Sequence, residues 1–230
     1  IGYGTVKKED LTGSVAVVTS EDLNRTPSSN IGKALQGRAP GVMVMSGGAP
    51  GSGVNIRVRG VGSITQDPDP LYVVDGVVGA DINSVAPQDI DTLQVLKDAS
   101  ATAIYGSRGS NGVILITTKG GRAGRNQVEF ETYVGFREVE RQLDMMGSRQ
   151  FAEIANERNL NDDLPIIFNE IDTLTDVNTD WQDEIFRRGF IQNYSLAFSG
   201  GNEKTTYLIS GNYFDEEGTI IGSNFSRGSV

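Results

Sequence analysis

The side chains of this sequence that can carry chemistry are carboxylates, lysines, arginines and tyrosines, because histidine and cysteine are both absent from the 230 residues. The chain therefore has no Ser-His or Cys-His mechanism, no thiolate metal site, no common zinc site and no disulfide. A hydrolase built on paired carboxylates would need two acids in one pocket, and the spacing of the acids does not show such a pair. We expect a protein that is not an enzyme and has no cofactor.

Three short motifs have the residue types of chemical sites, but each has a structural interpretation. Asp67-Pro-Asp-Pro70 can attract calcium, yet it fixes too few ligands and is typical of a rigid turn. Residues Gly106–Gly112 have the glycine content of a phosphate loop, but they precede a strand instead of opening a helix, which argues against nucleotide binding. Asp75-Gly76 follows an apolar run and predicts a tight turn. We assign no metal site.

The composition indicates a folded, acidic protein. Hydrophobic residues make up 37% and charged residues 22%, which fits neither a disordered chain nor a membrane helix. The formal net charge of -10 repels phosphate backbones, so nucleic acid is not an expected partner. Glycine contributes 29 residues, about twice its average share, which predicts many turns and close backbone approaches. The first residues lack the pattern of a signal peptide, and we expect a segment cut from a longer protein at both ends.

Residues 20–119 are predicted to form a small mixed β-sheet with short helices, an α+β module that follows an extended lead-in over residues 1–19. Ser29 or Asn30 can cap a helix that runs to Gln36. Asp98 can cap a second helix, over Ser100–Tyr105. From Gly41 the apolar period changes to two, which indicates strands. The predicted strands are Val42–Val44, Val54–Val58, Leu71–Val74, Leu93–Lys97 and Val113–Thr118. Because its apolar run is continuous, we expect the Leu71–Val74 strand to be central and buried.

Residues 120–230 begin with a flexible glycine-rich break and then change pattern. Gln127–Val139 alternates apolar and polar residues over 13 positions, whereas a tilted strand needs about 9 to 11 to cross a bilayer. Gln192–Ser199 and Lys204–Phe214 predict a similar hairpin. The aromatic positions Phe130, Phe136, Tyr207 and Tyr213 would face lipid, or form the core of a soluble sheet. Between the long strands, Ser148 can cap a helix within a loop near residues 148–180.

Several stretches together resemble the SusC/RagA type of TonB-dependent outer-membrane transporter. The first part of the resemblance lies in Gly2-Tyr-Gly-Thr-Val-Lys-Lys8 with Leu11-Thr-Gly-Ser14, in Ile56-Arg-Val-Arg-Gly60, and in Leu71-Tyr-Val-Val-Asp-Gly76. A further stretch runs from Val95-Leu-Lys-Asp-Ala-Ser-Ala-Thr-Ala-Ile-Tyr-Gly106 to Thr118-Lys119. Phe190-Ile-Gln-Asn-Tyr194 with Ser199-Gly-Gly-Asn-Glu-Lys-Thr-Thr-Tyr207 is similar to the family's early barrel strands. The order and spacing of these stretches span nearly the whole chain.

The resemblance implies a TonB-dependent receptor plug over residues 20–119, followed over residues 120–230 by about three or four antiparallel strands of an incomplete outer-membrane β-barrel. The loop near residues 148–180 would be extracellular. The implied function is a gating plug for the import of glycan or peptide fragments, opened by TonB pulling from the periplasm. The implied location is the cell outer membrane of a Gram-negative bacterium, with the plug inside the barrel. The implied partners are TonB, a SusD-like lipoprotein, an oligosaccharide or peptide substrate, and outer-membrane lipid around the full barrel.

The resemblance also nominates site residues. TonB recognition normally adds a strand to an extended segment, and a remnant of the TonB box would comprise Ile1, Gly2, Tyr3, Gly4 and Thr5. Carboxylates on the barrel wall would pair with Arg57, Arg59 and Arg108. The alternative is that these arginines are solvated or form ion pairs within the domain. Loops facing the substrate, or ordinary flexible connections, would contain Ser46, Gly47, Gly48, Ala49, Gly51, Ser52, Val78 and Asp81.

The alternative function is a soluble periplasmic or surface module for carbohydrate binding or adhesion. A plugged outer-membrane transporter has about 22 strands, so a transporter would need many further alternating segments after Val230. A module would end there or enter a linker. The complete reading frame distinguishes the two.

Overall fold

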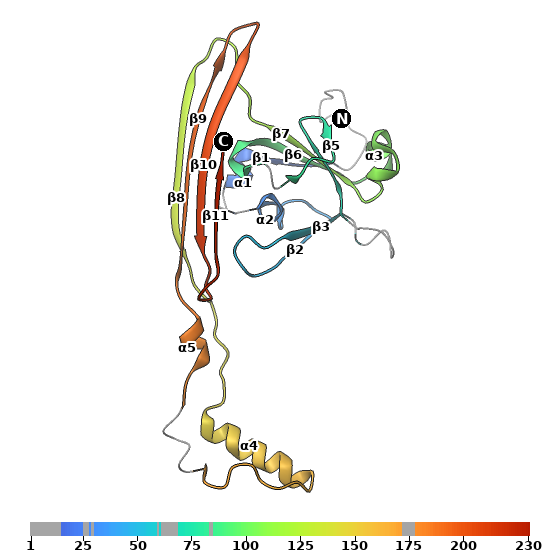
Figure 1. The fold of residues 1–230 in the computed structure, drawn as a ribbon. Helices are drawn as coiled ribbons and strands as arrows, with labels where there is room; N and C mark the ends of the chain where they lie inside the picture. Colours follow the sequence, from blue (N-terminus) through green and yellow to red (C-terminus); the bar gives the residue numbers. More distant parts are fainter. Residues whose placement is uncertain are drawn as a thin grey trace.

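The computed structural model describes residues 15–24, 28, 30–58, 60, 69–82, 85–171 and 178–230. Figure 1 shows a compact region of mixed sheet and short helices beside a curved layer of long strands, with a helical arm extending from one end of that layer. We call the described residues up to Lys119 the plug, and the long strands β8–β11 the wall. The arm is the part of residues 138–188 that the structure describes.

The plug is built on a mixed sheet with the strand order β1-β6-β7-β4-β5. These strands are β1 (Val15–Thr19), β6 (Ile90–Leu96), β7 (Val113–Thr118), β4 (Leu71–Val74) and β5 (Val77–Val78). The β4–β7 pair is parallel and the other pairs are antiparallel. The extended lead-in expected for residues 1–19 therefore ends in a paired strand at the edge of this sheet; residues 1–14 lie outside the described part of the chain.

A separate two-stranded hairpin and several short helices complete the plug. The hairpin pairs β2 (Val42–Ser46) with β3 (Val54–Val58). The helical elements are α1 (Ser20–Asn24), α2 (Ile31–Leu35), η3 (Pro87–Asp89), α3 (Ala99–Thr102) and η4 (Ala103–Gly109). Helix α2 begins after Asn30, whose side-chain oxygen accepts a hydrogen bond of 2.7 Å from the backbone N–H of Gly32, so the predicted cap is confirmed. Asp98 stands at the cap position of α3 but makes no capping hydrogen bond with its side chain, so that prediction was wrong.

The core of the plug lies between the sheet, helix α2 and the hairpin. Its fully buried members include Ile31 and Leu35 from α2, Ile56 from β3, Leu93 from β6 and Ile114 from β7. Strand β4 lies inside the sheet, between β7 and β5, as predicted. Only Val73 is fully buried, whereas Leu71, Tyr72 and Val74 are partly buried against the core.

The β4–β5 turn is tied to the end of β7. Asp75 and Gly76 both have positive φ, 47° and 87°, as the tight turn predicted for this dipeptide requires. The Asp75 carboxylate accepts hydrogen bonds from the backbone N–H of Thr118 (2.9 Å) and from its hydroxyl (2.7 Å). These bonds join the turn to the last residues of the plug.

The wall consists of β8 (Gln127–Arg137), β9 (Gly189–Gly201), β10 (Thr206–Glu217) and β11 (Asn224–Ser229). The order is β11-β10-β9-β8, and every neighbouring pair is antiparallel. Strand β9 begins earlier than predicted because Gly189–Ile191 pair with Gly135–Arg137 at the arm end of β8. The pattern of long antiparallel strands is confirmed.

The arm connects β8 to β9 and carries α4 (Ser148–Asn161) and α5 (Trp181–Ile185). Gly147, and not Ser148, occupies the cap position of α4. The buried Asn156 side chain donates to the carbonyl of Phe168 at 2.7 Å and accepts from the N–H groups of Ile167 and Phe168, so it fixes the segment that follows the helix. Among the described helices, none is both long and apolar enough to cross a membrane.

We predict that Asp75→Ala weakens the turn more than Asp75→Asn does. Alanine removes the acceptor and tolerates positive φ poorly, whereas asparagine keeps a neutral acceptor and tolerates that conformation. The free energy of local opening at the Thr118 amide, measured by hydrogen exchange in the full-length protein, should fall by about 1 kcal/mol for alanine and by less for asparagine. Unchanged exchange in Asp75→Ala would contradict the role of the carboxylate.

Candidate functional site: the interface between plug and wall

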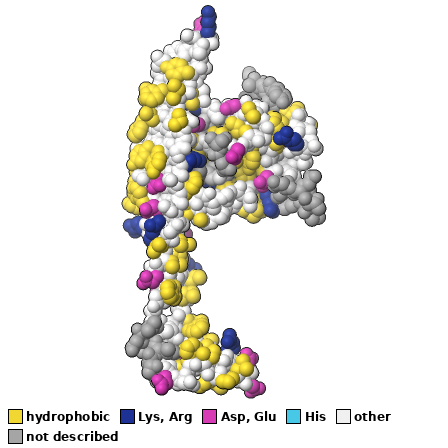
Figure 2. Space-filling model, in the orientation of Figure 1, with side chains coloured by type: hydrophobic (Ala, Val, Ile, Leu, Met, Phe, Trp, Pro, Cys, Tyr) yellow, Lys and Arg dark blue, Asp and Glu magenta, His cyan; other side chains and the backbone are white. Residues whose placement is uncertain are grey.

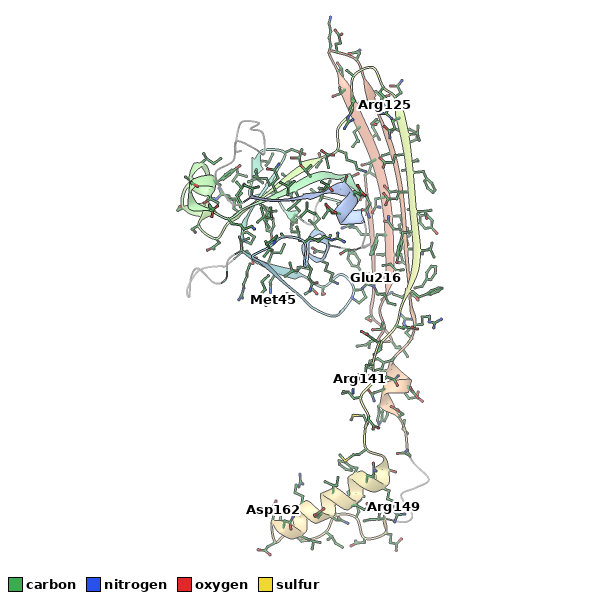
Figure 3. All side chains as sticks on the ribbon, turned by 180° about the vertical axis from the view of Figure 1, so that it is seen from behind. Met45, Arg125, Arg141, Arg149, Asp162 and Glu216 are labelled. Atoms are coloured by element: carbon green, nitrogen blue, oxygen red, sulfur yellow. The ribbon has the colours of Figure 1, made fainter. Side chains whose placement is uncertain are left out.

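The wall has one face against the plug and one face away from it. Strand register places Ile191, Phe214 and Glu216 on the plug side, and their exposed fractions are 2%, 0% and 0%. On the other side, Val128, Phe130 and Ile209 are 64%, 64% and 61% exposed. Since side chains alternate along a strand, each wall strand contributes to both faces. Figure 3 shows Glu216 between the strands and the plug.

At the arm end of the wall, the β2–β3 loop of the plug contacts β11 and the loop before it. Gly51 has φ +66°, and a Cβ built on it would lie 2.6 Å from Cγ of Phe225. A Cβ built on Gly218 would lie 3.0 Å from Cδ of Pro50. The ring of Phe225 packs in turn against Phe214, with centroids 6.3 Å apart. The loop tip therefore rests on an aromatic pair of the wall at a distance that only glycine permits.

An arginine of β11 faces the plug. Arg227 is opposite Phe214 in the β10–β11 ladder and faces the plug. Its guanidinium interacts electrostatically with the carboxylate of Asp89, the last residue of η3. The carbonyl of Asp89 also accepts a hydrogen bond of 2.7 Å from the backbone N–H of Lys119. Asp89 thus lies between the plug sheet, the wall and the segment at Lys119 by which the chain leaves the plug.

The buried carboxylate of Glu216 belongs to the wall itself. Its side chain is 1% exposed, and it forms an ion pair with Arg137 two strands away on β8. Breaking such a pair leaves an uncompensated buried charge, which is strongly destabilising. This pair holds the arm ends of the wall strands in register.

At the hairpin end of the wall, the chain leaves the plug and enters β8. Lys119 forms an ion pair of 3.4 Å with Glu129. The backbone N–H of Gly124 donates a hydrogen bond of 2.9 Å to the carbonyl of Gly201. A Cβ on Gly121 would lie 2.7 Å from the backbone N of Tyr207, so this glycine permits close passage of the two backbones. A cavity of about 520 Å³ remains between Ser20 and Asp91 of the plug and Ala197, Ser199 and Leu208 of the wall.

Comparison with known proteins agrees with this architecture. Residues 7–113 match the family model of the TonB-dependent receptor plug domain. The chain is 47% identical over 232 residues to TonB-dependent receptor P3 of Formosa agariphila, covering 100% of this chain and 22% of that protein. It is 40% identical over 238 residues to TonB-dependent receptor SusC of Bacteroides thetaiotaomicron, covering 99% of this chain and 23% of that protein.

The structure superposes on the RagAB peptide importer in its "open-open" state with a TM-score of 0.84 and 30% identity, covering 99% of this chain and 29% of that chain. This chain belongs to the SusC/RagA type of TonB-dependent receptors. The siderophore receptor PirA of Acinetobacter baumannii, at a TM-score of 0.53 and 22% identity, shares the fold. The predicted family and fold class are therefore confirmed. The chain spans about a quarter of the length of these relatives.

In this SusC/RagA-type plug, the structure describes two of the three arginines nominated from the sequence, Arg57 and Arg108. Arg57 is partly buried on β3, and among the described residues it forms no ion pair with the wall. Arg108 lies in η4 next to α3, on the side of the plug remote from the wall, where its guanidinium passes close to Gly79 (Figure 1). Arg59 and the nominated TonB-box residues Ile1–Thr5 lie outside the described residues.

The nominated substrate-facing residues do not form one surface. Ser46, Gly47, Gly48, Ala49, Gly51 and Ser52 belong to the end of β2 and the β2–β3 loop, on the side of the plug toward the arm (Figure 1). Val78 and Asp81 lie at and after β5, on the opposite side of the sheet in the same view. The serine of the first loop fixes its shape, because the Ser52 hydroxyl donates a hydrogen bond of 2.6 Å to the carbonyl of Gly47.

The sequence did not indicate Phe225, Arg227 or Asp89 as interface residues. Asn224–Ser229 alternates large and small side chains, which is a strand signal that places Phe225 and Arg227 on one face. That signal does not show what the face contacts, since the partners belong to a loop and a short helical turn far away in the chain.

We predict that Gly51→Ala disturbs this interface, whereas Gly48→Ala does not. An alanine at position 51 collides with Phe225 and has an unfavourable φ, while a Cβ at position 48 meets nothing within 4 Å. In the full-length transporter, hydrogen exchange should rise in the β2–β3 loop and in β11 for Gly51→Ala alone. In the double variant Gly51→Ala/Phe225→Ala the collision should be absent, while the unfavourable φ of residue 51 remains. If both glycine variants behave alike, the contact does not position the loop.

Proposed function

We propose that this chain supplies the gate of a TonB-dependent transporter in the outer membrane of a Gram-negative bacterium, with the plug inside the barrel that the wall begins. The observation that carries the proposal is the position of β1. It is the N-terminal strand of the plug, it lies at the edge of the sheet, and its ladder to β6 is its one strand pairing among the described residues. A pull from the N-terminal side therefore acts first on a strand with one neighbour.

The work needed to remove β1 is small compared with unfolding the plug. The ladder comprises Val15–Thr19 paired with Thr92–Leu96, and Val18 is the fully buried residue of the strand at 2% exposure. Strands β6 and β7 keep their own pairing when β1 leaves. Local opening costs less than global unfolding, so a pull by TonB from the periplasm can remodel the plug without expelling it.

The wall supports a membrane location over a soluble module. Its side facing away from the plug exposes large apolar residues on successive rows, and hydrophobic side chains gather along that edge in Figure 2. Soluble monomers rarely expose contiguous apolar patches of this kind. In a complete barrel the same face would contact lipid, with the aromatic residues near its borders.

Substrate and partners follow from the relatives and are part of the proposal. RagAB is described as a peptide importer, and SusC is a TonB-dependent receptor. We propose import of peptide or glycan fragments, with a SusD-like lipoprotein as the extracellular partner and no enzymatic activity. The β2–β3 loop, on the side of the plug toward the arm, is the proposed first contact for the substrate.

A disulfide between β1 and β6 tests the gate. Val17 and Gln94 are opposite each other in the ladder, where Cβ atoms lie about 4.5–5.5 Å apart, close to disulfide distance. The chain has no native cysteine. We predict that Val17→Cys/Gln94→Cys in the full-length transporter abolishes uptake of substrate by cells under oxidising conditions, and that a reductant restores it.

The matched control is Met45→Cys/Asn55→Cys, which locks the β2–β3 hairpin through an equivalent antiparallel pair. That hairpin is not in the path of a pull on β1, so its disulfide should leave uptake within about twofold of the reduced protein, a barrier change of less than about 0.5 kcal/mol. Uptake that continues with a fully formed β1–β6 disulfide would refute the proposed gate.

A further inference from the structure

The segment by which the chain leaves the plug, Gly120–Arg125, carries two neighbouring arginines. Arg122 and Arg125 pair across a tight turn in an isolated antiparallel bridge, and both side chains are exposed. Side chains that are opposite each other in such a pair point to the same side, where like charges are destabilising. Among the residues that the structure describes, neither guanidinium forms a hydrogen bond or an ion pair. The turn therefore holds two positive charges that no described carboxylate contacts.

The backbone of this turn is fixed against the hairpin end of the wall. The N–H of Gly124 donates to the carbonyl of Gly201, and Gly121 passes close to the backbone of Tyr207. Gly124 has a φ of +74°, a conformation that glycine adopts readily. Figure 3 shows Arg125 at the end of the wall that is remote from the arm. The fixed backbone keeps the two arginines near each other.

Both arginines line the cavity between the plug and the wall, which we call the exit cavity. Its volume of about 520 Å³ lies within the range of about 300–1,000 Å³ typical of ligand sites. The other charged residues of its lining are Asp91 and the ion pair of Lys119 with Glu129, at 3.4 Å. Outside that pair, two arginines face one acid, in a chain whose net charge is -10. The exit cavity thus has a local excess of positive charge.

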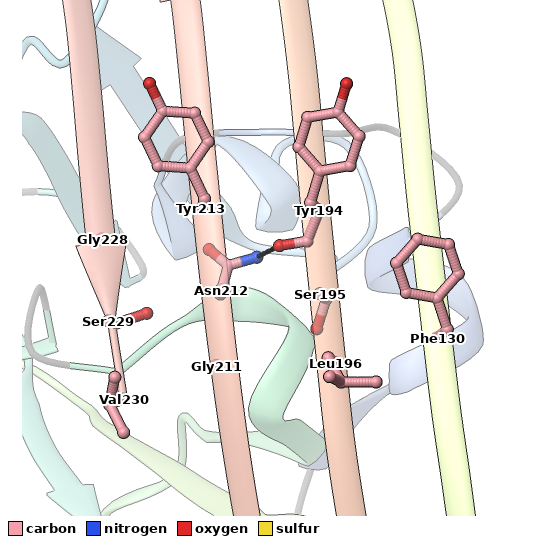
Figure 4. Close-up of a pocket in the computed structure, with 10 residues that line it drawn as sticks. All are labelled: Phe130, Tyr194, Ser195, Leu196, Gly211, Asn212, Tyr213, Gly228, Ser229 and Val230. Atoms are coloured by element: carbon pink, nitrogen blue, oxygen red, sulfur yellow. Dashed lines mark hydrogen bonds between the residues drawn. The ribbon is translucent and has the colours of Figure 1, made fainter.

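This charge is not a general property of the wall. The groove on the outer face of the same strands has no charged residue in its lining, which includes Phe130, Tyr194 and Tyr213 (Figure 4). On the plug side, Gln127 of β8 and Ser199 of β9 are opposite each other and line the exit cavity. The cations of the exit cavity all belong to the segment that leaves the plug, and none belongs to the wall strands.

The exit cavity borders the strand that the proposed gate removes. Ser20, on the plug side of the cavity, directly follows Thr19, the last residue of β1. Asp91 directly precedes Thr92, the partner of Thr19 in the β1–β6 ladder. Removal of β1 would widen the cavity on this side, so a fragment that passes there would meet the two arginines.

We propose that the exit cavity binds an anionic group of the imported fragment, a carboxylate or a sulfate ester, between Arg122 and Arg125. Planar guanidinium groups bind such oxyanions through paired, charge-assisted hydrogen bonds. An anion between the arginines also offsets the repulsion of their like charges. The inference rests on the proposed function and adds a substrate class to it, namely acidic fragments.

A thiol placed in the exit cavity tests whether an anion occupies it. Ser199→Cys puts this thiol on the plug side of β9, and the 230 residues contain no other cysteine. In the purified full-length transporter, the rate of its reaction with the neutral reagent N-ethylmaleimide is followed by mass spectrometry of the peptide that contains position 199. The acidic probes are tri-glutamate and trigalacturonate, and the neutral probes are tri-glutamine and galactotriose. Inorganic sulfate is the free-anion probe, and ionic strength is held equal throughout.

Either acidic trimer, or both, at about 10 mM should slow the reaction about tenfold, as mass action gives for a dissociation constant of about 1 mM. The neutral trimers should have no effect. Arg122→Gln/Arg125→Gln should remove the protection and keep the rate without probe, which shows that the cavity is intact. The matched control Arg141→Gln/Arg149→Gln, on the arm (Figure 3), should keep the protection. Protection by one acidic trimer alone would identify the fragment as peptide or glycan.

Three results would overturn the inference. The first is no protection by either acidic trimer, or protection that survives in Arg122→Gln/Arg125→Gln. The second is equal protection by inorganic sulfate, which would mean a site for free anions and not for an imported fragment. The third is a thiol that does not react without probe, because another part of the protein then fills the cavity. The assay needs neither TonB nor uptake, so its outcome is independent of the β1–β6 disulfide test of the gate.

Discussion

The ladder between β1 and β6 is the interaction on which the proposed gate depends. It keeps the N-terminal strand in the plug sheet, and Val18 of that strand lies beside Leu93 in the core. Strand β6 in turn begins next to Asp89, which interacts with Arg227 of the wall. Strand β6 therefore lies between β1 on one side and, through Asp89, the electrostatic environment of Arg227 on the other.

Side chains along the wall strands alternate between a face toward the plug and a face away from it, and the two faces carry different residues. On its plug side, Phe214 and Glu216 are buried, Phe214 packs against Phe225, and Glu216 pairs with the partly exposed Arg137. On its outer side, apolar residues remain exposed and small residues leave a groove. Because the period is two, a shift of one residue in register would exchange these faces, placing Glu216 outside and apolar rings against the plug. The cross-strand ion pair and the close glycine contacts oppose such a shift.

Local patterns predicted much of the fold, but not the interface. The apolar run Val113–Thr118 and the alternation after Gln127 each predict a strand from a few neighbouring residues. Asn30 caps a helix through a hydrogen bond to a residue two positions away. The contact of Gly51 with Phe225 joins residues from two parts of the chain, and no local pattern encodes it. Asp98 shows that residue type and position are not enough to predict a cap, because it stands at the cap position of α3 and its side chain makes no capping hydrogen bond. The arrangement of a plug followed by barrel strands was predicted from the resemblance to a family, because hydrophobic periodicity does not show how distant elements pack.

Pulling the full-length transporter from its N-terminus in a lipid bilayer, one molecule at a time, tests the gate most directly. The proposed gate predicts a first rupture at low force that releases β1 and lengthens the chain by about 3.4 Å for each freed residue, followed by a distinct, stronger resistance from β6, β7 and β4. A single rupture that extracts or unfolds the whole plug would contradict it, because β1 would then not be a separately removable strand.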